Sequence, residues 1–384
     1  KRLSFTSDID FAVGFADLIF IAVGTPQDED GSADVSSVLK VAGSITKSMT
    51  DDKYIVIKST VPVGTSEQVE EFMSSRLSQL KSDLTVSIAS NPEFLKEGCA
   101  INDFMKPDRI IIGSLGDDIK TTLKELYKPF NRNHQRIMFM DPRSSELTKY
   151  VANSMLAAKV SFMNEMSNIA ERLGADIESV REGIGSDTRI GYSFIYPGPG
   201  FGGSCFPKDI KALIKSSKDV LYEPKMLQAI DKVNTNQKGI LYKKIDFHFN
   251  GELDNKTICL WGLSFKPDTD DMRESPSLPL IDSLIESGAS VRVYDPEAMD
   301  ECRKIYKGNK NIFYATSPIE AAESADALVV VTEWKEFRTI DIEKLKEALN
   351  HLNIFDGRNI YNPDLLESEG FVYFGIGRGK SIYN

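Results

Sequence analysis

The segment GFGGSCFPKD, residues 200–209, combines the residue types that a reactive cysteine requires. Glycines at 198, 200, 202 and 203 let the backbone approach a ligand closely and expose its N–H groups. Pro207 suits the first turn of a helix, so we expect Cys205 just before a helix N-terminus, where the dipole favours the thiolate. Asp209 follows four residues later and can orient a water or a base. A buried structural cysteine is the alternative, but the glycines and charges around Cys205 favour the reactive interpretation.

The segment SNPEFLKEG, residues 90–98, follows an expected strand. Asn91 is a good helix N-cap and Pro92 suits the first helical position. Glu93 and Glu97 would then share one helical face, where like charges oppose each other's ionisation, as a general base requires. A solvated helix end is the alternative, and this segment alone favours it.

The segment ELTKYVANSM places Lys149 and Asn153 four residues apart on an expected helix. A lysine and an amide directed to one point can stabilise a developing oxyanion. A surface lysine beside an ordinary asparagine is an equally weighted alternative.

Cations also gather after an expected strand near the C-terminus. Lys266 and Arg273 lie in GLSFKPDTDDMRES, residues 262–275, and Arg358 ends another expected strand. Ligands of α/β sheets bind at the carboxyl ends of the strands, and these cations suit phosphates. Ordinary loop charge is the alternative, and the convergence of three cations argues against it.

Two similar stretches, residues 7–26 and 317–334, each predict a short helix followed by a buried parallel strand. Chance similarity of two such units is the alternative. The other expected strands lie within 53–64, 84–94, 109–114, 256–265, 290–296, 353–358 and 371–377. With helices between most of them, the fold class predicted is α/β, with two Rossmann-like doubly wound parallel-sheet domains joined by a central all-α domain.

The centre of the chain is expected to be helical. Residues 144–173 predict one long helix, capped by Ser144 or Ser145 and ended by Gly174, and more helix is expected over 208–249. Its apolar positions, which predict a core stripe and a dimer surface, are Leu147, Val151, Met155, Ala158, Phe162 and Met166. The predicted domains are 1–140, 141–249, which is helical and dimerising, and 250–384; the family resemblance given below implies cofactor binding for the first and substrate binding for the third.

Composition narrows the class of protein. A net charge of −11 disfavours nucleic acid as a partner, and no apolar run is long enough to span a membrane. The four cysteines are far apart and form no CxxC pair, which argues against zinc and disulfides, so no metal and a reducing cytoplasm are expected.

Several long motifs resemble those of the UDP-glucose 6-dehydrogenase family, within the wider nucleotide-sugar 6-dehydrogenases. They occur in the family's order and span almost the whole chain: AVGTP, KSTVPVGT, SNPEFLKEG, DFMKPDRIIIG, ELTKYVANSMLAAKVSFMNE, GIGSDTRIG, GFGGSCFPKD, GLSFKPDTDDMRESPS and FDGR. The resemblance implies oxidation of UDP-glucose to UDP-glucuronate by two NAD in succession, through a thiohemiacetal and a thioester on the cysteine.

The resemblance also implies roles for individual residues. Cys205 resembles the nucleophile, Lys149 with Asn153 the oxyanion stabilisers, Asp209 the holder of a catalytic water, and Glu93 with Thr60 the groups that handle the hydrolytic water. The implied NAD contacts are Thr25, Thr60, Glu97 and Arg273. The implied nucleotide-sugar contacts are Glu93, Phe94, Leu95, Lys149, Asn153, Arg189, Tyr196, Phe201, Gly202, Lys266 and Arg358. Arg189 resembles a residue lent by a neighbouring subunit, which implies a homodimer.

One departure from the family concerns the cofactor. The family begins with a strand and a GxGxxG turn that holds the NAD pyrophosphate, and this sequence contains no GxGxxG. At about 30 residues per βαβ unit, roughly 60 residues of the family pattern are missing. We expect them in an N-terminal part outside this sequence.

Other readings stay open at this point. GDP-mannose 6-dehydrogenases carry similar cysteine loops, and UDP-N-acetylhexosamine dehydrogenases are a more distant alternative. A nucleotide-sugar-binding protein without catalysis is the alternative from another class. Cys205, Lys149, Asn153, Asp209 and Glu93 together argue against it, because a pure binder needs no nucleophile.

Overall fold

The computed structural model describes residues 3–130 and 135–383 of the 384-residue chain. The chain forms two compact units, each built on one β-sheet. The first unit comprises Lys1–Asn153 and Lys208–Pro224, and the second comprises Ser154–Pro207 and Lys225–Asn384. Within the described ranges, no helix is long and apolar enough to cross a membrane.

The first unit contains a five-stranded sheet of order β1-β2-β3-β4-β5. Its strands are β1 Leu18–Ile21, β2 Lys53–Ile57, β3 Val86–Ser90, β4 Ile110–Gly113 and β5 Ile137–Met140. The first three strands are parallel, whereas β3 and β4 meet antiparallel at Ser90 and Gly113. The sheet is therefore mixed rather than wholly parallel as predicted, because the connection from β3 to β4 holds only a six-residue helix and forms no crossover along the sheet.

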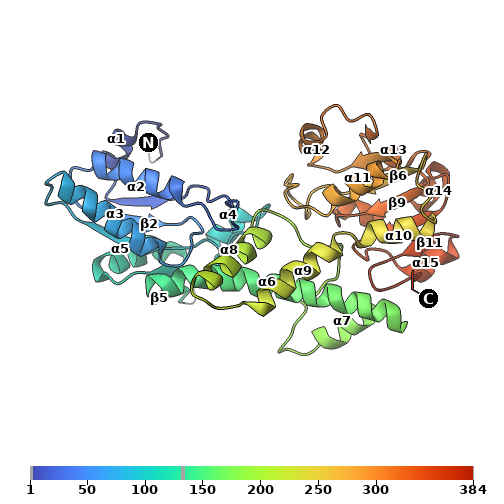
Figure 1. The fold of residues 1–384 in the computed structure, drawn as a ribbon, viewed down its shortest axis with the longest axis horizontal. Helices are drawn as coiled ribbons and strands as arrows, with labels where there is room; N and C mark the ends of the chain where they lie inside the picture. Colours follow the sequence, from blue (N-terminus) through green and yellow to red (C-terminus); the bar gives the residue numbers. More distant parts are fainter. Residues whose placement is uncertain (1–2, 131–134, 384) are drawn as a thin grey trace. The chain divides into compact units, whose positions relative to one another are not determined.

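Helices cover both faces of this sheet. The helices of this unit are α1 Ile9–Phe15, α2 Ser36–Ser48, α3 Thr65–Gln79, α4 Ala100–Met105, α5 Asp117–Tyr127, a 3-10 turn Lys128–Phe130, the first part of α6 Pro142–Leu173, and most of α8 Phe206–Asp219. α2 and α3 run side by side along the sheet (Figure 1). Ile55 and Ile57 of β2 pack with α2 and α3, while Val56 between them packs with α5. This alternation is the mark of a strand buried on both faces.

The second unit contains a six-stranded parallel sheet of order β11-β10-β9-β6-β7-β8. Numbered from β6, this is the 3-2-1-4-5-6 order of a Rossmann fold, read from the β8 edge. The strands are β6 Thr257–Trp261, β7 Ser290–Tyr294, β8 Ile312–Tyr314, β9 Ala327–Val330, β10 Asn353–Asp356 and β11 Val372–Phe374. The sequence patterns did not predict β8, whose three residues are too few to show a period.

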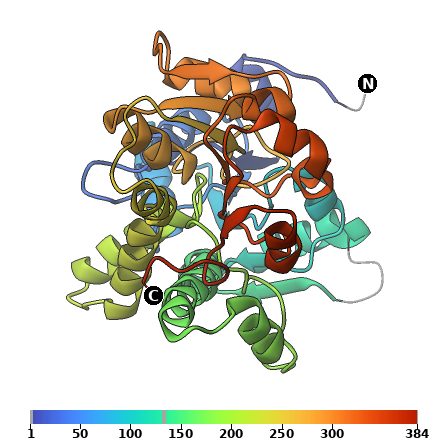
Figure 2. The same ribbon diagram turned by 90° about the vertical axis from the view of Figure 1, so that its right-hand side faces the viewer.

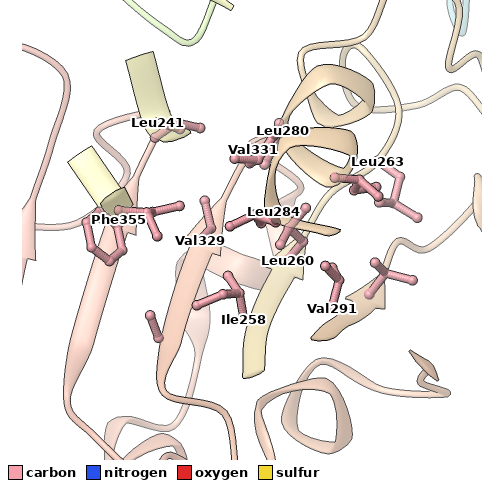
Figure 3. Close-up of a cluster of buried hydrophobic side chains, with 14 of the residues drawn as sticks. Leu241, Ile258, Leu260, Leu263, Leu280, Leu284, Val291, Val329, Val331 and Phe355 are labelled. Carbon is pink, nitrogen blue, oxygen red and sulfur yellow. The ribbon is translucent and has the colours of Figure 1, made fainter. Parts of the chain in front are cut away.

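The second unit contains the following helices, several of which pack against its sheet. They are the rest of α6, then α7 Ile177–Gly185, α9 Lys225–Gln237, α10 Ile240–His248, α11 Ser277–Glu286, α12 Met299–Ile305, α13 Pro318–Ala322, a 3-10 turn Lys335–Thr339, α14 Ile342–Ala348 and α15 Pro363–Ser368. Figure 3 shows Leu280 and Leu284 of α11 lying over Ile258 and Leu260 of β6 in the fully buried core. Five consecutive helices, α6 to α10, separate the two sheets along the chain, which confirms the predicted fold class.

Helix α6 starts two residues earlier than predicted. Its first turn is capped by Asp141, whose carboxylate accepts a hydrogen bond from the Ser144 N–H at 2.9 Å, so neither serine is the cap. Gly174 ends the helix with a φ of +71°, as expected for the residue after a helix.

Most of the apolar stripe of α6 does not form core, contrary to the prediction, although the half-buried Met166 packs against the cluster around Met163. Leu147, Val151, Met155 and Phe162 are between 40% and 62% exposed. The opposite face of the same helix is buried and carries polar residues such as Glu146, Lys149 and Asn153 among apolar ones. The local pattern could not indicate this, because the partners of those polar groups come from distant segments.

The C-terminal segment crosses the second part of α6 (Figure 2). A side chain at Gly377 would meet Ser167 at 2.8 Å, and the Ile382 N–H donates to Glu171. Glu171 in turn receives the Lys244 ammonium at 2.6 Å, with both side chains buried. This ion pair joins α6, α10 and the C-terminal segment.

Candidate functional site

Residues 91–96 form a loop after β3, not the predicted helix, which starts only at Ala100. The Asn91 side chain is used elsewhere: its amide donates to the Ile111 carbonyl at 2.7 Å and its oxygen accepts from the Tyr127 hydroxyl at 2.5 Å. Asn91 therefore cannot cap a helix, and Glu93 and Glu97 do not share a helical face. Glu97 lies in the turn before α4.

Glu93 pairs with Lys149 of α6. The Lys149 ammonium, which is buried, donates to one Glu93 oxygen at 3.2 Å, and the other oxygen accepts from the Leu95 N–H at 2.5 Å. The same ammonium lies 5.4 Å from the centre of the Phe94 ring. The structure thus brings together four of the predicted residues, Glu93, Phe94, Leu95 and Lys149, the last of which carries a buried positive charge.

Asn153 pairs with Asp209 of α8. The Asn153 amide donates to Asp209 at 2.6 Å, and the Asp209 side chain is 1% exposed. Burial raises the pKa of Asp209, and the opposing influences of Lys208, the Asn153 hydrogen bond and Lys149 do not cancel it. Lys149 and Asn153 share a buried face, as predicted, but each is held by its own carboxylate.

Thr25 and Thr60 meet beyond the ends of β1 and β2. The Thr25 hydroxyl donates to the Thr60 carbonyl at 2.8 Å. The Lys208 ammonium donates to the Thr25 carbonyl at 3.1 Å and lies 3.6 Å from Asp209. A continuous chain of polar contacts therefore links the two threonines to the Asp209–Asn153 pair.

Glu146 is a buried group that the sequence analysis missed. One turn before Lys149 on α6, its carboxylate accepts from the Gly64 and Ser66 N–H groups at 2.6 and 2.8 Å. Burial raises the pKa of Glu146 despite these bonds. Because Gly64 and Ser66 begin α3, this contact sets α6 against the loop that carries Thr60. The sequence could have indicated Glu146, because it lies three residues before Lys149 and seven before Asn153 and therefore on the same helical face.

The glycine loop before Cys205 lies in the second unit. Asn234 of α9 binds the Phe201 backbone twice, accepting from its N–H at 2.7 Å and donating to its carbonyl at 3.0 Å. A side chain at Gly203, where φ is +84°, would meet the Phe265 ring at 2.8 Å, and one at Gly202 would collide with the Glu274 carbonyl. These two glycines therefore permit the protein's own loops to pack. The half-buried Cys205 directly precedes α8, with Pro207 in the first turn, as predicted.

Three strand ends of the second sheet meet beside this loop. Arg358 donates to the Val331 carbonyl at 2.7 Å and to the Phe265 carbonyl at 3.2 Å, joining the segments after β10, β9 and β6. A side chain at Gly198 would approach the Arg358 guanidinium at 3.0 Å. The Arg273 carbonyl accepts from the Gly203 N–H. Phe201, Gly202, Lys266, Arg273 and Arg358 thus belong to one group of contacting loops at the carboxyl edge, where ligands of such sheets bind.

Tyr196 and Arg189 lie outside this group of loops. Tyr196 is exposed and stacks under the Arg181 guanidinium at 4.4 Å. Arg189 is exposed and pairs with Asp187 at 2.5 Å.

The edge of the first sheet suits part of a nicotinamide nucleotide. Thr25 and Thr60 follow neighbouring parallel strands and offer hydroxyl groups. A side chain at Gly24 would meet nothing within 4 Å, so the backbone beside Thr25 is open to a ligand. The Thr25 hydroxyl already donates to the Thr60 carbonyl, so the open backbone at Gly24 is the feature that can receive part of a cofactor. Of the other predicted cofactor contacts, Glu97 belongs to this unit and Arg273 to the second.

Comparisons with known proteins agree along the whole chain. Models of the UDP-glucose/GDP-mannose dehydrogenase family match its NAD binding domain to residues 1–131, its central domain to 143–236 and its UDP binding domain to 259–363. The UDP-glucose 6-dehydrogenase of Pseudomonas aeruginosa is 47% identical over 383 residues, covering 99% of this chain and 84% of that protein. The UDP-glucose 6-dehydrogenase of Rhizobium meliloti is 43% identical over 380 residues, covering 98% and 85%. A solved UDP-glucose dehydrogenase from Pyrobaculum islandicum superimposes with a TM-score of 0.87 at 34% identity, covering 98% of this chain and 83% of that one.

Proposed function

Because the chain belongs to the UDP-glucose/GDP-mannose dehydrogenase family, we propose that it oxidises UDP-glucose to UDP-glucuronate with NAD as acceptor. The observation that carries this proposal is the buried polar face of α6. There Glu93 binds Lys149 and Asp209 binds Asn153, each carboxylate coming from another segment. Burying the Lys149 and Asp209 charges costs free energy of folding. A protein that only binds a nucleotide sugar has no use for that arrangement.

In the proposed reaction, Cys205 holds the substrate carbon between two oxidations. NAD, when bound, supplies the oxidising power by accepting hydride. The Cys205 thiolate adds to the aldehyde carbon and gives a thiohemiacetal, which keeps the aldehyde from leaving. After the second oxidation the carbon is a thioester. Water adds to it and gives one proton to Glu93, the C–S bond breaks, and Cys205 leaves as thiolate.

The polar groups of the first unit suit the charges that this reaction develops. Lys149 and Asn153 can donate to the oxygen of a tetrahedral intermediate, and their buried position strengthens each hydrogen bond. Asp209, held by Asn153, orients a water, and Thr60 with Glu93 handles the hydrolytic water. Thr25, Thr60 and Glu97 are the proposed cofactor contacts in this unit.

Substrate binding is proposed for the loops of the second unit. The Lys266 ammonium and the Arg358 guanidinium suit the diphosphate, since both stand at the carboxyl edge of the Rossmann-ordered sheet. The backbone around Phe201 and Gly202 and the exposed Tyr196 complete the set, and Arg273 contacts the cofactor. Phe94 and Leu95 are proposed to contact the sugar from the first unit.

A homodimer is proposed from the surface of α6. Exposed apolar residues recur along the helix at Leu147, Val151, Met155 and Phe162, and a second copy would remove them from water. Arg189 is proposed to serve the partner's site. We also propose a cytoplasmic location and the three domains 1–140, 141–249 and 250–384, which the matches at 1–131, 143–236 and 259–363 support.

The test is the stoichiometry of NADH. The protein is incubated with limiting UDP-glucose, GDP-mannose or UDP-N-acetylglucosamine and excess NAD, and NADH is followed at 340 nm. Two NADH per UDP-glucose, with little from the other two sugars, is the expected result. One NADH or none per UDP-glucose refutes the proposal. Faster turnover of GDP-mannose than of UDP-glucose would identify GDP-mannose as the substrate.

The Cys205→Ser variant tests the nucleophile. Turnover should fall at least 1,000-fold, since serine lacks the acidity of a thiol, and the substrate should be trapped at the aldehyde or bound level. Mass spectrometry of the quenched protein detects the bound species. Normal turnover of this variant would rule Cys205 out as the nucleophile.

A further inference from the structure

Lys58 is a half-buried lysine in the first unit that the proposed reaction does not yet use. It directly follows β2, and its neighbour across the sheet is Asn91, whose N–H donates to the Ile57 carbonyl at 2.9 Å. The Lys58 ammonium lies 3.4 Å from both the backbone and the side-chain oxygen of Asn91. It also faces the Phe104 ring at 5.9 Å. Lys58 is therefore held at the start of the loop that carries Glu93.

Lys58 and Glu93 line the same cavity of about 60 Å³. The other charged groups around it are Lys96, Asp103, Lys106, Asp108 and Arg109. Lys96 and Asp103 form an ion pair at 2.8 Å, and the Arg109 guanidinium stacks on Phe94 at 3.9 Å. Lys106 in this lining is exposed, and the Tyr127 hydroxyl of α5, also in the lining, donates to the Asn91 side chain.

Charge coupling links Lys58 to the Glu93–Lys149 pair. Burial lowers the pKa of Lys58 to about 8, Glu93 opposes this shift and Lys149 adds to it. Both lysines therefore interact electrostatically with the Glu93 carboxylate, and Lys149 is the one that lies within hydrogen-bonding distance of it. At neutral pH the Lys58 ammonium remains largely protonated, since its pKa lies above 7.

The two lysines differ in what they are free to do. Lys149 is the proposed donor to the substrate oxygen, and any turn toward that oxygen weakens its bond to Glu93. Lys58 is anchored to Asn91 and does not take part in that exchange. A carboxylate that loses its partner in a half-buried site costs free energy unless a second cation stays near it.

We propose that Lys58 is a positioning residue for the proposed oxidation, supplying Glu93 with a second, fixed positive charge that keeps it ionised and in place while Lys149 serves the substrate. This inference rests on the proposed function for the roles of Glu93 and Lys149. The Lys58–Glu93 coupling itself can be measured without substrate.

The first measurement is a titration of Glu93 in the full chain. The protein is labelled with glutamate carrying ¹³C at the carboxyl carbon, and the Glu93 signal is assigned from its loss in Glu93→Gln. In Lys58→Met the midpoint of the Glu93 titration should lie about one pH unit higher than in wild type, because a nearby opposite charge favours the ionised form. Lys106→Met is the matched control, since it removes an exposed lysine from the lining of the same cavity, and its midpoint should not move.

The second measurement is the pH profile of kcat with UDP-glucose. Lys58→Met should move the acid limb upward by a similar amount and lower kcat about tenfold at neutral pH, with KM changed less than about twofold. Lys58→Arg should restore most of kcat, because it keeps the charge. Lys58→Gln retains a donor for Asn91 without the charge, and should behave like Lys58→Met. It replaces that variant if methionine prevents folding.

Each result supports or overturns the inference. A Glu93 midpoint that stays in place in both neutral variants refutes it, whether or not the protein turns over. An unmoved acid limb, or Lys58→Gln equal to wild type, also refutes it. Wild-type protein that yields no NADH from UDP-glucose refutes the proposed function instead, and the titration still decides the role of Lys58.

Discussion

Asn153→Ala removes the amide that donates to the buried carboxylate of Asp209. The two atoms are 2.6 Å apart, and the Asp209 side chain is 1% exposed, so water cannot replace the lost donor without rearrangement. The other Asp209 oxygen has no hydrogen-bond partner within the described residues, and Lys208 lies 3.6 Å from it. The substitution therefore leaves a buried negative charge with a distant ammonium as its main support.

The expected loss of stability follows from the charge on the acceptor. A hydrogen bond to a charged group contributes about 1.5–3 kcal/mol, and one between neutral groups about 1 kcal/mol. Asn153→Ala should therefore lower the free energy of unfolding by about 2 kcal/mol when Asp209 is ionised. In an Asp209→Asn background, where the acceptor is neutral, the same substitution should cost about 1 kcal/mol.

The loss should depend on pH in a defined direction. Burial already raises the pKa of Asp209 above its unfolded value of 3.8, so the native state binds this proton more tightly than the unfolded state does. The native carboxylate is thus penalised above its folded pKa, and the penalty disappears as the pH falls through that value. Asn153→Ala increases this penalty, so its cost should be full where Asp209 is ionised and should shrink toward about 1 kcal/mol as the pH falls and Asp209 becomes protonated.

Denaturant unfolding of wild type, both single variants and the double variant at several pH values tests this reasoning. Asn153 and Asp209 both belong to the first unit, so signals from that unit should be followed. The double-mutant cycle should show a coupling of about 1 kcal/mol at pH 8 and less in acid. A cost for Asn153→Ala that is the same at every pH, or the same in the Asp209→Asn background, would contradict an interaction with the ionised carboxylate.

Two further substitutions test the second unit and the surface of α6. Lys244→Met should destabilise the protein by about 3–5 kcal/mol because it leaves the buried Glu171 unpaired, and adding Glu171→Leu should restore most of that loss. Thermal or denaturant unfolding checks both, and a Lys244→Met protein as stable as wild type would contradict the buried pair. Met155→Glu with Phe162→Glu should give a monomer in sedimentation velocity, since both side chains are exposed on one chain and are proposed to meet a second copy. Lys215→Glu, on α8 rather than α6, is the control and should leave the dimer unchanged. A double variant that remains dimeric would mean that the dimer forms through another surface.

Local spacing was sufficient for several parts of the site. Lys149 and Asn153 lie one helical turn apart, so any helix through them puts both on one face, and the structure buries both. Pro207 also predicted the helix start after Cys205 from local chemistry. Proline has no backbone N–H, and N–H groups in the first turn of a helix have no partner within the helix. The repeated helix–strand units at 7–26 and 317–334 also form, as α1–β1 and α13–β9.

Longer-range pairing decided the features that the patterns missed. Asn91 satisfies the rules for a helix cap, but its side chain bonds to Ile111 and Tyr127, 20 and 36 residues away, and residues 91–96 form a loop. The apolar stripe of α6 satisfies the rules for a core face. The polar face is buried instead because Glu93, Asp209 and the start of α3 supply partners to Lys149, Asn153 and Glu146.

The residues of this protein therefore specify by themselves where most of the longer helices and strands form, and which side chains share a helical face, because these depend on periods of two or about 3.6 residues along one segment. They do not specify which face is buried or which charges are paired. That depends on whether another segment brings a hydrogen-bond partner to each polar group, and such a partner can be found only once the chain has folded. The same condition applies to Lys58, which lines one cavity with Glu93 only because β2 and β3 end side by side.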